Sequence, residues 1–397
     1  MAYFRNSIVN LLNLHYGIHA LAMTGGGAFY AVYLLKSGVP LPGVLVAMAA
    51  ILLGRFIIRP AIIPLTIRFG LRPLLIAGTL IGAMQYPVLA HVHGVGWTLL
   101  GLCALSSLGD TVYWSTYHAY FAALGDADHR GQQVSVREAI TAVVGIISPL
   151  TTGWVLVRYG ANAAFGATAF AQTLAALPLL KTPNVAVMPH VPGVLKVALP
   201  AVLLFVGDGW IGAGLVFVWQ LALFGVLHDS YLGFGGAMAI AALAGAVGGL
   251  VLGRHIDAGR GGRMVWIALT GLAGIIVLRA ASLGHPALAV FAHALASVGT
   301  CLYIPVLMTA VYNQAKKSAC TLRFHVGTEG GWDVGGGAAC LVAAAMLALG
   351  APLWLTLLLP LGGILLNLIL LQRYYARLAA PLATSRAEHP AAVSRID

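Results

Sequence analysis

The sequence predicts an all-α polytopic membrane protein with twelve transmembrane helices. The 397-residue chain is 60% hydrophobic and only 8% charged, and its mean hydropathy is +0.92. Soluble globular proteins carry about 25% charged residues, and a soluble core cannot bury this much apolar surface. Apolar runs of about 20 residues recur along the chain, and each can cross a bilayer as a helix. We expect helices because lipid offers no other partner for backbone polar groups.

Short turns with charged residues, proline or glycine separate the apolar runs. The predicted spans are 10–35, 41–65, 74–90, 97–123, 138–157, 162–180, 197–226, 231–253, 264–282, 286–314, 326–349 and 352–375. An even number of spans places both termini on one side of the membrane. All of the 22 Lys and Arg except Lys36, Arg158 and Arg279 fall on that side. This asymmetry predicts that both termini are cytoplasmic.

Composition and motifs also exclude several classes of function. The net charge of +11 does not indicate a nucleic-acid partner, because the basic residues are interleaved with the spans. The four cysteines have neither metal-finger nor redox spacing. The sequence contains no nucleotide-binding Gly-x4-Gly-Lys-Ser/Thr loop and no His-Glu-x-x-His motif, so it supports neither ATP drive nor zinc proteolysis. We therefore expect no enzymatic activity, no cofactor and no resident metal.

A charged, glycine-rich turn separates the eighth and ninth spans. It reads Gly-Arg-His-Ile-Asp-Ala-Gly-Arg-Gly-Gly-Arg over 253–263. A weaker copy after the second span keeps Arg68 and Arg72 but has Ile67 where the later copy has Asp257. These turns resemble the loop motif of the major facilitator superfamily of transporters (Gly-x-Leu-x-Asp-Arg-x-Gly-Arg-Arg). In that family the motif follows the second helix and, more weakly, the eighth.

The two copies of the turn indicate an internal duplication. The spacing between them also separates Tyr113 from Tyr303, and Glu138 pairs with Glu329 one residue further along. Duplicated halves are common in transporters. The resemblance implies the superfamily fold, with two pseudo-symmetric six-helix bundles. The predicted domains are an N-terminal bundle over 1–180, a cytoplasmic linker over 181–196, a C-terminal bundle over 197–375 and a cytoplasmic tail over 376–397.

Two acids lie near the middle of predicted spans, Asp110 in the fourth and Asp208 in the seventh. The resemblance implies that the first, fourth, seventh and tenth spans line a central cavity, so both acids are expected to face it. Ionisable groups inside a membrane are costly and usually serve a pathway or a partner. We expect Asp110 and Asp208 to carry protons or to bind a cationic group. The alternative is a structural hydrogen bond between helices.

The first span carries His15 and His19, which share one helix face because they are four residues apart. Histidine titrates near neutral pH, so the pair can carry protons or contact a substrate. The same spacing suits two metal ligands, but a metal site needs a third ligand from elsewhere. A structural role, as polar residues wetted by the cavity, is the remaining alternative.

Aromatic residues accompany both acids. In the fourth span Tyr113, Trp114 and Tyr117 follow Asp110 at steps that place them near one helix face. An acid bordered by aromatic rings can hold an organic substrate by stacking and by a charged contact. Packing is the alternative, because aromatic stripes more often serve it. The corresponding candidates in the second half are Trp210 and Tyr303.

Charged residues near predicted helix ends suggest a cytoplasmic gate. Glu138 begins the fifth span, and Glu329 and Asp333 begin the eleventh, where acids also interact favourably with the helix dipole. In the superfamily the loop acid faces a helix start in the opposite half, which implies that Asp257 contacts the start of the fifth span. Ile67 cannot do the same at the eleventh, so we expect an asymmetric latch. The expected gating residues are Arg68, Arg72, Glu138, Asp257, Arg263, Glu329 and Asp333.

The fifth span contains Ser148-Pro149 followed by Gly153, which resembles the Gly-Pro-x-x-Gly-Gly element of exporters in the superfamily. We therefore expect a secondary transporter that exports a small organic solute by alternating access, driven by protons. Import by symport and transport of a metal ion or metal chelate are alternatives. A membrane enzyme and a receptor on the same fold are rivals of another class. The expected partners are the solute, protons and the lipid bilayer but no nucleic acid, for a monomer in the bacterial inner membrane.

Overall fold

A computed structural model of the chain describes residues 6–124, 130–189, 191, 193–252 and 261–387, and all secondary structure in them is helical. The helices of the first half are α1 (Ser7–Ala22), α2 (Tyr30–Lys36), α3 (Leu41–Ile58), α4 (Ile62–Phe69), α5 (Leu71–Ala90), α6 (Trp97–Leu124), α7 (Arg130–Leu174) and α8 (Ala176–Leu179). The helices of the second half are α9 (Val194–Gly212), α10 (Trp219–Val226), α11 (Tyr231–Leu252), α12 (Gly261–Ala281), α13 (Pro286–Ala315), α14 (Thr321–Ala348), α15 (Leu353–Thr356) and α16 (Pro360–Ala387).

Ten helical segments among the described residues are long and apolar enough to cross a membrane. One of them, Arg137–Leu179, runs through α7 and α8 and covers most of the fifth and sixth predicted spans together, but its backbone leaves helical geometry at Gly160 (φ 82°, ψ 178°). The fourth predicted span corresponds to α6, which has 28 residues and is not among the ten. Polar residues such as Ser106, Ser107 and Asp110 interrupt its apolar sequence.

Two helices begin earlier than the sequence predicts. The predicted fifth and eleventh spans begin at 138 and 326, whereas α7 begins at Arg130 and α14 at Thr321. Glu329 and Asp333 therefore lie about two and three turns inside α14. Their expected position at a helix start is wrong, and the helix dipole does not account for a carboxylate this far from the end.

Each half contains a π-helical turn in its first long helix. One covers Met23–Gly27, between α1 and α2, and the other covers Ala213–Val218, between α9 and α10. The two turns are separated by the same number of residues as Tyr113 and Tyr303. The repeated residues of the sequence therefore coincide with a repeated irregularity of the backbone, of the kind often found at functional sites.

Glycines allow several helices to approach closely, as in other membrane proteins. A Cβ atom on Gly25 would lie 2.6 Å from Ser148 Oγ on α7, and one on Gly331 of α14 would lie 2.5 Å from the Val202 carbonyl oxygen on α9. Side chains larger than hydrogen would separate these helices. Both packing contacts hold together helices that are distant in sequence.

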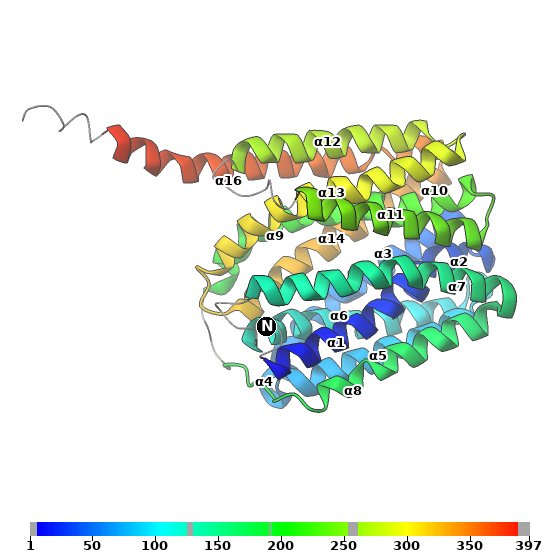
Figure 1. Cartoon of the computed structure of the whole chain (residues 1–397), viewed down its shortest axis with the longest axis horizontal. Helices are drawn as coiled ribbons and strands as arrows, with labels where there is room; N and C mark the ends of the chain where they lie inside the picture. Colours follow the sequence, from blue (N-terminus) through cyan, green and yellow to red (C-terminus); the bar gives the residue numbers. More distant parts are fainter. Residues whose placement is uncertain (1–5, 125–129, 190, 192, 253–260, 388–397) are drawn as a thin grey trace, which may run out of the picture.

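In Figure 1, α1, α5 and α8 lie in the lower part of the view and α12, α13 and α16 in the upper part, with α3, α7, α11 and α14 between them. Helices of the first half contact helices of the second half mainly through two pairs, α3 with α14 and α7 with α11. At the second pair, a Cβ on Gly153 of α7 would lie 2.7 Å from the Tyr231 carbonyl oxygen of α11. The functional residues lie between these two pairs of helices.

Candidate functional site

A cavity of about 740 Å³ lies between the two pairs of contacting helices and is lined by side chains from both halves of the chain. Asp110 of α6 and Asp208 of α9 both line it, as the resemblance implies. Arg55 of α3 and Glu329 of α14 also line the cavity, so charged groups from four helices face one space. This is the size and setting of a site for a small organic molecule.

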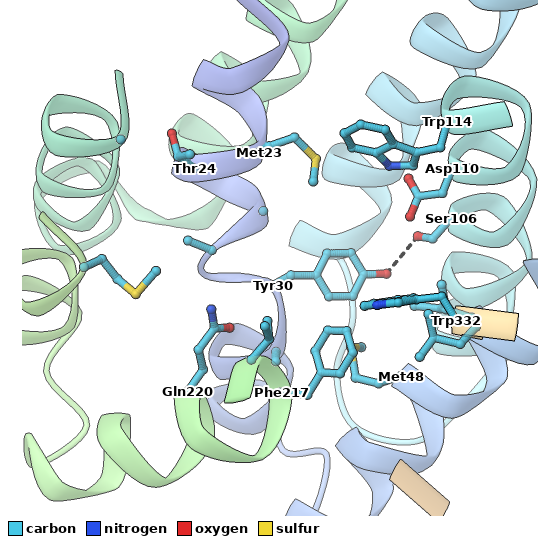
Figure 2. Close-up of a pocket in the computed structure, with 18 of the residues that line it drawn as sticks. Met23, Thr24, Tyr30, Met48, Ser106, Asp110, Trp114, Phe217, Gln220 and Trp332 are labelled. Carbon is cyan, nitrogen blue, oxygen red and sulfur yellow. Dashed lines mark hydrogen bonds between the residues drawn. The ribbon is translucent and has the colours of Figure 1, made fainter. Parts of the chain in front are cut away.

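Aromatic and polar side chains form much of the cavity wall. Figure 2 shows Tyr30 pointing into the cavity, with Trp114, Phe217 and Trp332 around it. The Tyr30 hydroxyl lies 2.9 Å from Ser106 Oγ, which in turn donates a hydrogen bond to a glutamine oxygen of α5 at 2.8 Å. Because the serine proton is used in that second bond, Tyr30 donates to Ser106. The ring of Tyr30 is therefore held in a fixed direction inside the cavity.

A buried cluster of charges joins α3 to α14 beside this cavity. Arg55 Nε lies 3.0 Å from Asp333 Oδ1, although the two atoms are poorly aligned for a hydrogen bond. Arg55 also lies 3.9 Å from Asp110 and 3.9 Å from Glu329. One guanidinium group therefore contacts acids of both α6 and α14.

Arg59, one turn further along, completes the cluster. Its Nε donates to Asp333 Oδ2 at 3.0 Å, its Nη2 donates to the same oxygen, and its Nη1 donates to Ser115 Oγ at 3.1 Å. Glu329 lies 3.8 Å from Arg59 and 3.7 Å from His118. Asp333 is fully buried, and the arginine side chain is 2% exposed. The cluster thus holds two arginines and three carboxylates, counting Asp110.

The charge cluster separates two cavities. Arg55 and Glu329 line the larger one, whereas Arg59 lines a second cavity of about 440 Å³. The walls of the second cavity include Val191 and Lys196, next to the segment that connects the two halves, and Arg323 near the start of α14. The ion pairs therefore form a partition between the central cavity and the end of the molecule where this segment lies.

Asp208 is held by a chain of hydrogen bonds within the second half. Tyr303 donates its hydroxyl proton to Asp208 Oδ1 at 2.8 Å and accepts a hydrogen bond from Asn367 Nδ2 at 2.8 Å. Trp210 donates its indole N–H to the Leu359 carbonyl oxygen at 2.8 Å, and it does not line the cavity. Tyr303 thus supports an acid of the cavity wall, whereas Trp210 connects α9 to the turn before α16.

The two histidines of the first helix lie away from the cavity. His15 is fully buried; its Nδ1 donates to the Ala175 carbonyl oxygen at 2.7 Å, so its Nε2 accepts from the Tyr113 hydroxyl at 3.2 Å. His19 bonds to Gln172 at 2.9 Å and stacks on Tyr113 with ring centroids 4.0 Å apart. Neither histidine lines the cavity, so the alternative of polar residues wetted by it is wrong, and the expected proton or substrate contact of the pair stays a prediction.

The expected common face on α6 is also wrong in part. Asp110 and Trp114 line the cavity, one turn apart, whereas Tyr113 and Tyr117 do not. The two tyrosines are 2% and 0% exposed and pack against the first helix, where the Tyr117 ring lies 6.1 Å from that of His15. Tyr113, three residues from Asp110, is rotated about 60° from it, enough to turn toward α1. Tyr117, seven residues on, is rotated by only about 20° but lies about two turns further along α6, where Tyr16 and His15 of α1 cover it.

Among the expected gating residues, Glu329 and Asp333 are the ones in the described part of the chain that form ion pairs with the opposite half. Arg72 donates to the Thr182 carbonyl oxygen at 2.7 Å, within its own half. Glu138 pairs with its neighbour Arg137 on the surface. Arg68 and Arg263 are exposed. Asp257 lies outside the described residues, so its role and the latch built on it stay a prediction.

Sequence reasoning missed Arg55, Arg59 and Trp332. Arg55 lies near the middle of the second predicted span and Arg59 in its last third, and both contribute to the asymmetry of positive charge that predicts topology. A usable signal was present: they are four residues apart, like His15 and His19, and so share a helix face. Two cations on one face of an apolar span require partners.

Comparison with known proteins agrees with the fold. A proton-dependent oligopeptide (POT) family transporter matches with a TM-score of 0.71 at 11% identity, over 91% of this chain and 100% of that one. An auto-inhibited POT family peptide transporter matches with a TM-score of 0.64 at 12% identity, over 94% and 97%. The human organic anion transporter MFSD10 matches with a TM-score of 0.63 at 16% identity, over 92% and 99%. No curated protein matches the sequence significantly.

The sequence model of the Major Facilitator Superfamily matches residues 13–322, which is most of the chain. This match, the helical architecture and the cavity shared by both halves lead to one identification. The chain belongs to the major facilitator superfamily, as an integral membrane protein and a secondary transporter rather than an enzyme.

Proposed function

We propose that this transporter exports a small organic solute in exchange for protons, by alternating access between two six-helix bundles. The central cavity carries the proposal, because it is lined from both halves by aromatic rings and by Asp110, Asp208 and Glu329. Carboxylates within a membrane are costly and usually mark a substrate or proton pathway. Movement of the bundles about such a site would expose it to one side at a time.

Several features support twelve spans in two bundles. The break at Gly160 divides α7 into two segments, and α6 is long enough to cross the membrane at 28 residues. With the remaining spans these give twelve. The contacts α3–α14 and α7–α11 would then be the surfaces along which the bundles move. We propose the domain limits 1–180 and 197–375 for the two bundles, with the termini in the cytoplasm of a bacterial cell.

The charge balance of the cluster favours proton coupling. Arg55 and Arg59 carry two positive charges, whereas Asp110, Glu329 and Asp333 can carry three negative ones, and His118 beside Glu329 adds a positive charge only when it holds a proton. An unbalanced charge in a medium of low dielectric constant is costly. A proton or the cationic group of a solute would remove the imbalance, and the two would compete for it. Competition for one carboxylate is sufficient to exchange solute for protons.

The partition between the two cavities suggests how binding is linked to movement. Arg59 and Asp333 join the halves at the end of the central cavity nearest the connecting segment. Neutralisation of a carboxylate in the cluster would weaken this contact, because each arginine would keep fewer partners. We propose that the contact is the cytoplasmic gate and that protons or solute control it through Asp110 and Glu329.

The proposed exchange is tested with purified protein in sealed liposomes that contain a pH-sensitive dye. Solutes are first selected by their effect on thermal stability, and each is then added outside without an imposed gradient. Entry of a solute exchanged for protons makes the lumen alkaline, whereas symport makes it acidic. Acidification of the lumen would indicate import by symport instead of export. The absence of any proton movement during solute uptake would refute proton coupling.

A matched pair of variants tests the site. Asp110→Asn should abolish the proton signal and retain the fold, because the amide keeps the shape but cannot titrate. Asp229→Asn is the control, since Asp229 lies exposed in a turn with φ 56°, a conformation that asparagine also tolerates. Normal proton-coupled uptake in Asp110→Asn would remove this acid from the mechanism.

The structure gives no separate support to a metal substrate. Among the described residues, no three His, Cys, Asp or Glu side chains are grouped so that they could hold a metal ion. His15 uses both ring nitrogens, with Ala175 and Tyr113, and His19 uses its Nδ1 with Gln172. The proposal is therefore restricted to organic solutes.

A further inference from the structure

A third buried arginine, in the second half, has no carboxylate partner among the described residues. Arg279 of α12 is 4% exposed, and no Asp or Glu in the described part of the chain forms an ion pair with it. It donates to the Leu215 carbonyl oxygen at 3.0 Å and to His293 Nδ1 at 3.2 Å, and its guanidinium lies 4.5 Å from the Trp219 ring centroid. Within the part of the chain that the structure describes, its Nε has no hydrogen-bond partner.

The neighbours of His293 fix the position of its proton. Arg279 Nη2 and Trp219 Nε1 both lie 3.2 Å from His293 Nδ1, and both groups are donors only. His293 Nδ1 must therefore accept, which leaves the ring proton on Nε2. That N–H points at the thioether sulfur of Met238, 3.2 Å away, which is a weak acceptor. The imidazole is thus held as a hydrogen-bond donor with a positive charge behind it.

This donor faces the central cavity. His293 and Met238 line the cavity together with Gln220 and Ser297, which offer further polar groups. A nitrogen that carries a proton cannot bind a metal ion, so the arrangement suits an oxygen acceptor instead. An oxygen of a bound molecule would be a better acceptor than the Met238 sulfur, and a negatively charged oxygen would also be attracted by Arg279.

The fold itself does not require these polar residues. At the spacing that relates Tyr113 to Tyr303, the positions equivalent to Trp219, Arg279 and His293 are Phe29, Leu89 and Cys103. All three of these are buried in the apolar core. The first half therefore packs the same place without a charge, and a costly buried arginine in the second half calls for a specific use.

We propose that His293 and Arg279 form a subsite for a carboxylate or similar anionic group of the transported molecule. His293 Nε2–H donates to the anion, and Arg279 supplies the charge that holds it. This inference deepens the proposed function, on which its relevance to transport rests. The transported solute would carry an anionic group that binds at His293 and a cationic or neutral polar group that binds near Asp110. Anion binding itself can be measured without any flux.

The test measures binding of benzoate to the purified full-length protein in detergent near pH 7, by tryptophan fluorescence and by thermal shift. Benzamide is the control probe, since it has the same shape but no charge. The expected result is saturable binding of benzoate at constant ionic strength, with an affinity for benzamide that is lower by about 10-fold or more. Equal affinity for both probes, or no saturable binding of either, would overturn the proposal.

Two substitutions at one position separate binding from packing. His293→Asn keeps an acceptor for Arg279 and Trp219 but removes the donor from the Nε2 position, so it should weaken benzoate binding about 10- to 100-fold. His293→Gln places an amide N–H near that position and should recover part of the affinity. If a folded His293→Asn protein bound benzoate as tightly as the wild type, the role of His293 would be refuted.

A third substitution keeps the test decisive if both His293 variants fail to fold. Met238→Leu preserves the apolar volume and releases the His293 N–H from its weak acceptor. It should bind benzoate at least as tightly as the wild type, and weaker binding would contradict the assignment. Asp110→Asn should retain benzoate binding while losing proton coupling, so failure of the anion subsite and failure of the proposed exchange give different results.

Discussion

Substitutions in the buried ion pair between Arg59 and Asp333 should reduce the stability of the protein strongly. Their side chains are 2% and 0% exposed, and they join the turn directly after α3 to α14. Arg59→Met should reduce the free energy of unfolding by about 3–5 kcal/mol, because the carboxylate remains buried with one arginine fewer. Asp333→Leu should cost at least as much, since it leaves both Arg55 and Arg59 without this partner.

The double variant Arg59→Met/Asp333→Leu distinguishes a true interaction from two separate packing defects. It removes the stranded charges of the pair, so the losses should not add, and a coupling of about 2–3 kcal/mol is expected. Equilibrium unfolding in detergent micelles, followed by tryptophan fluorescence, measures all four proteins of the cycle. The chain contains 8 tryptophans, which provide the signal.

The surface pair Arg137–Glu138 serves as the matched control. Its atoms approach to 2.6 Å, but the side chains are 19% and 58% exposed. Exposed ion pairs contribute about 0–1 kcal/mol, because water screens them and two long side chains lose freedom. The same cycle on this pair should give a coupling in that range. If the buried pair gave no more than the surface pair, the reasoning about a desolvated charge cluster would be wrong.

Three further predictions concern packing and hydrogen bonding. Gly153→Val should lower the free energy of unfolding by about 1–3 kcal/mol, because a Cβ there would lie 2.7 Å from a carbonyl oxygen of α11. Gly145→Ala on the same helix should be near neutral, since its Cβ would lie 3.4 Å from the nearest atom, the Cβ of Ala242. Equilibrium unfolding of both variants checks this. Tyr303→Phe removes the 2.8 Å hydrogen bond to Asp208 and should lower the free energy of unfolding by about 1–3 kcal/mol. It should also alter the affinity for the solute, which a binding titration measures. His15→Phe strands a buried carbonyl and should cost about 1–3 kcal/mol without changing solute affinity, because the residue lies outside the cavity; a changed affinity would contradict that position.

The helices could be predicted from the sequence because lipid imposes one rule on every span: a long apolar run must form a helix. The same reasoning found Asp110 and Asp208, since an isolated acid in such a run is conspicuous. It placed Tyr113 and Tyr117 on the same face as Asp110 because helical spacing gives an approximate direction but not the neighbouring helix. In the structure that neighbour is the first helix, whose histidines bury both tyrosines.

The ion cluster could not be predicted in the same way, because its partners are distant in sequence. Arg59 and Asp333 are 274 residues apart, and nothing local to Arg59 indicates an acid on α14. A cation near the end of an apolar span is also the ordinary signal of topology. The sequence does single out Glu329 and Asp333, but it predicts that their helix begins at 326, whereas α14 begins five residues earlier, at Thr321. Both acids therefore lie further inside the helix than the sequence predicts.

The two contacts between the halves differ in chemistry, and this difference bears on the proposed direction of movement. The contact with α14 at the end of α3 depends on ion pairs of Arg55 and Arg59. The contact α7–α11 depends on Gly153 and Gly235, where an added Cβ would lie 2.7 Å and 2.5 Å from a carbonyl oxygen of the other helix. Protonation of a carboxylate would weaken the first contact and leave the second unchanged, since no ion pair joins α7 to α11 among the described residues. A proton that enters the cluster would therefore favour opening at the end nearest the connecting segment, and its release would favour closure there. If the proposed gate responds to protons at one end only, it can give the two proposed bundles a preferred direction of coupled movement.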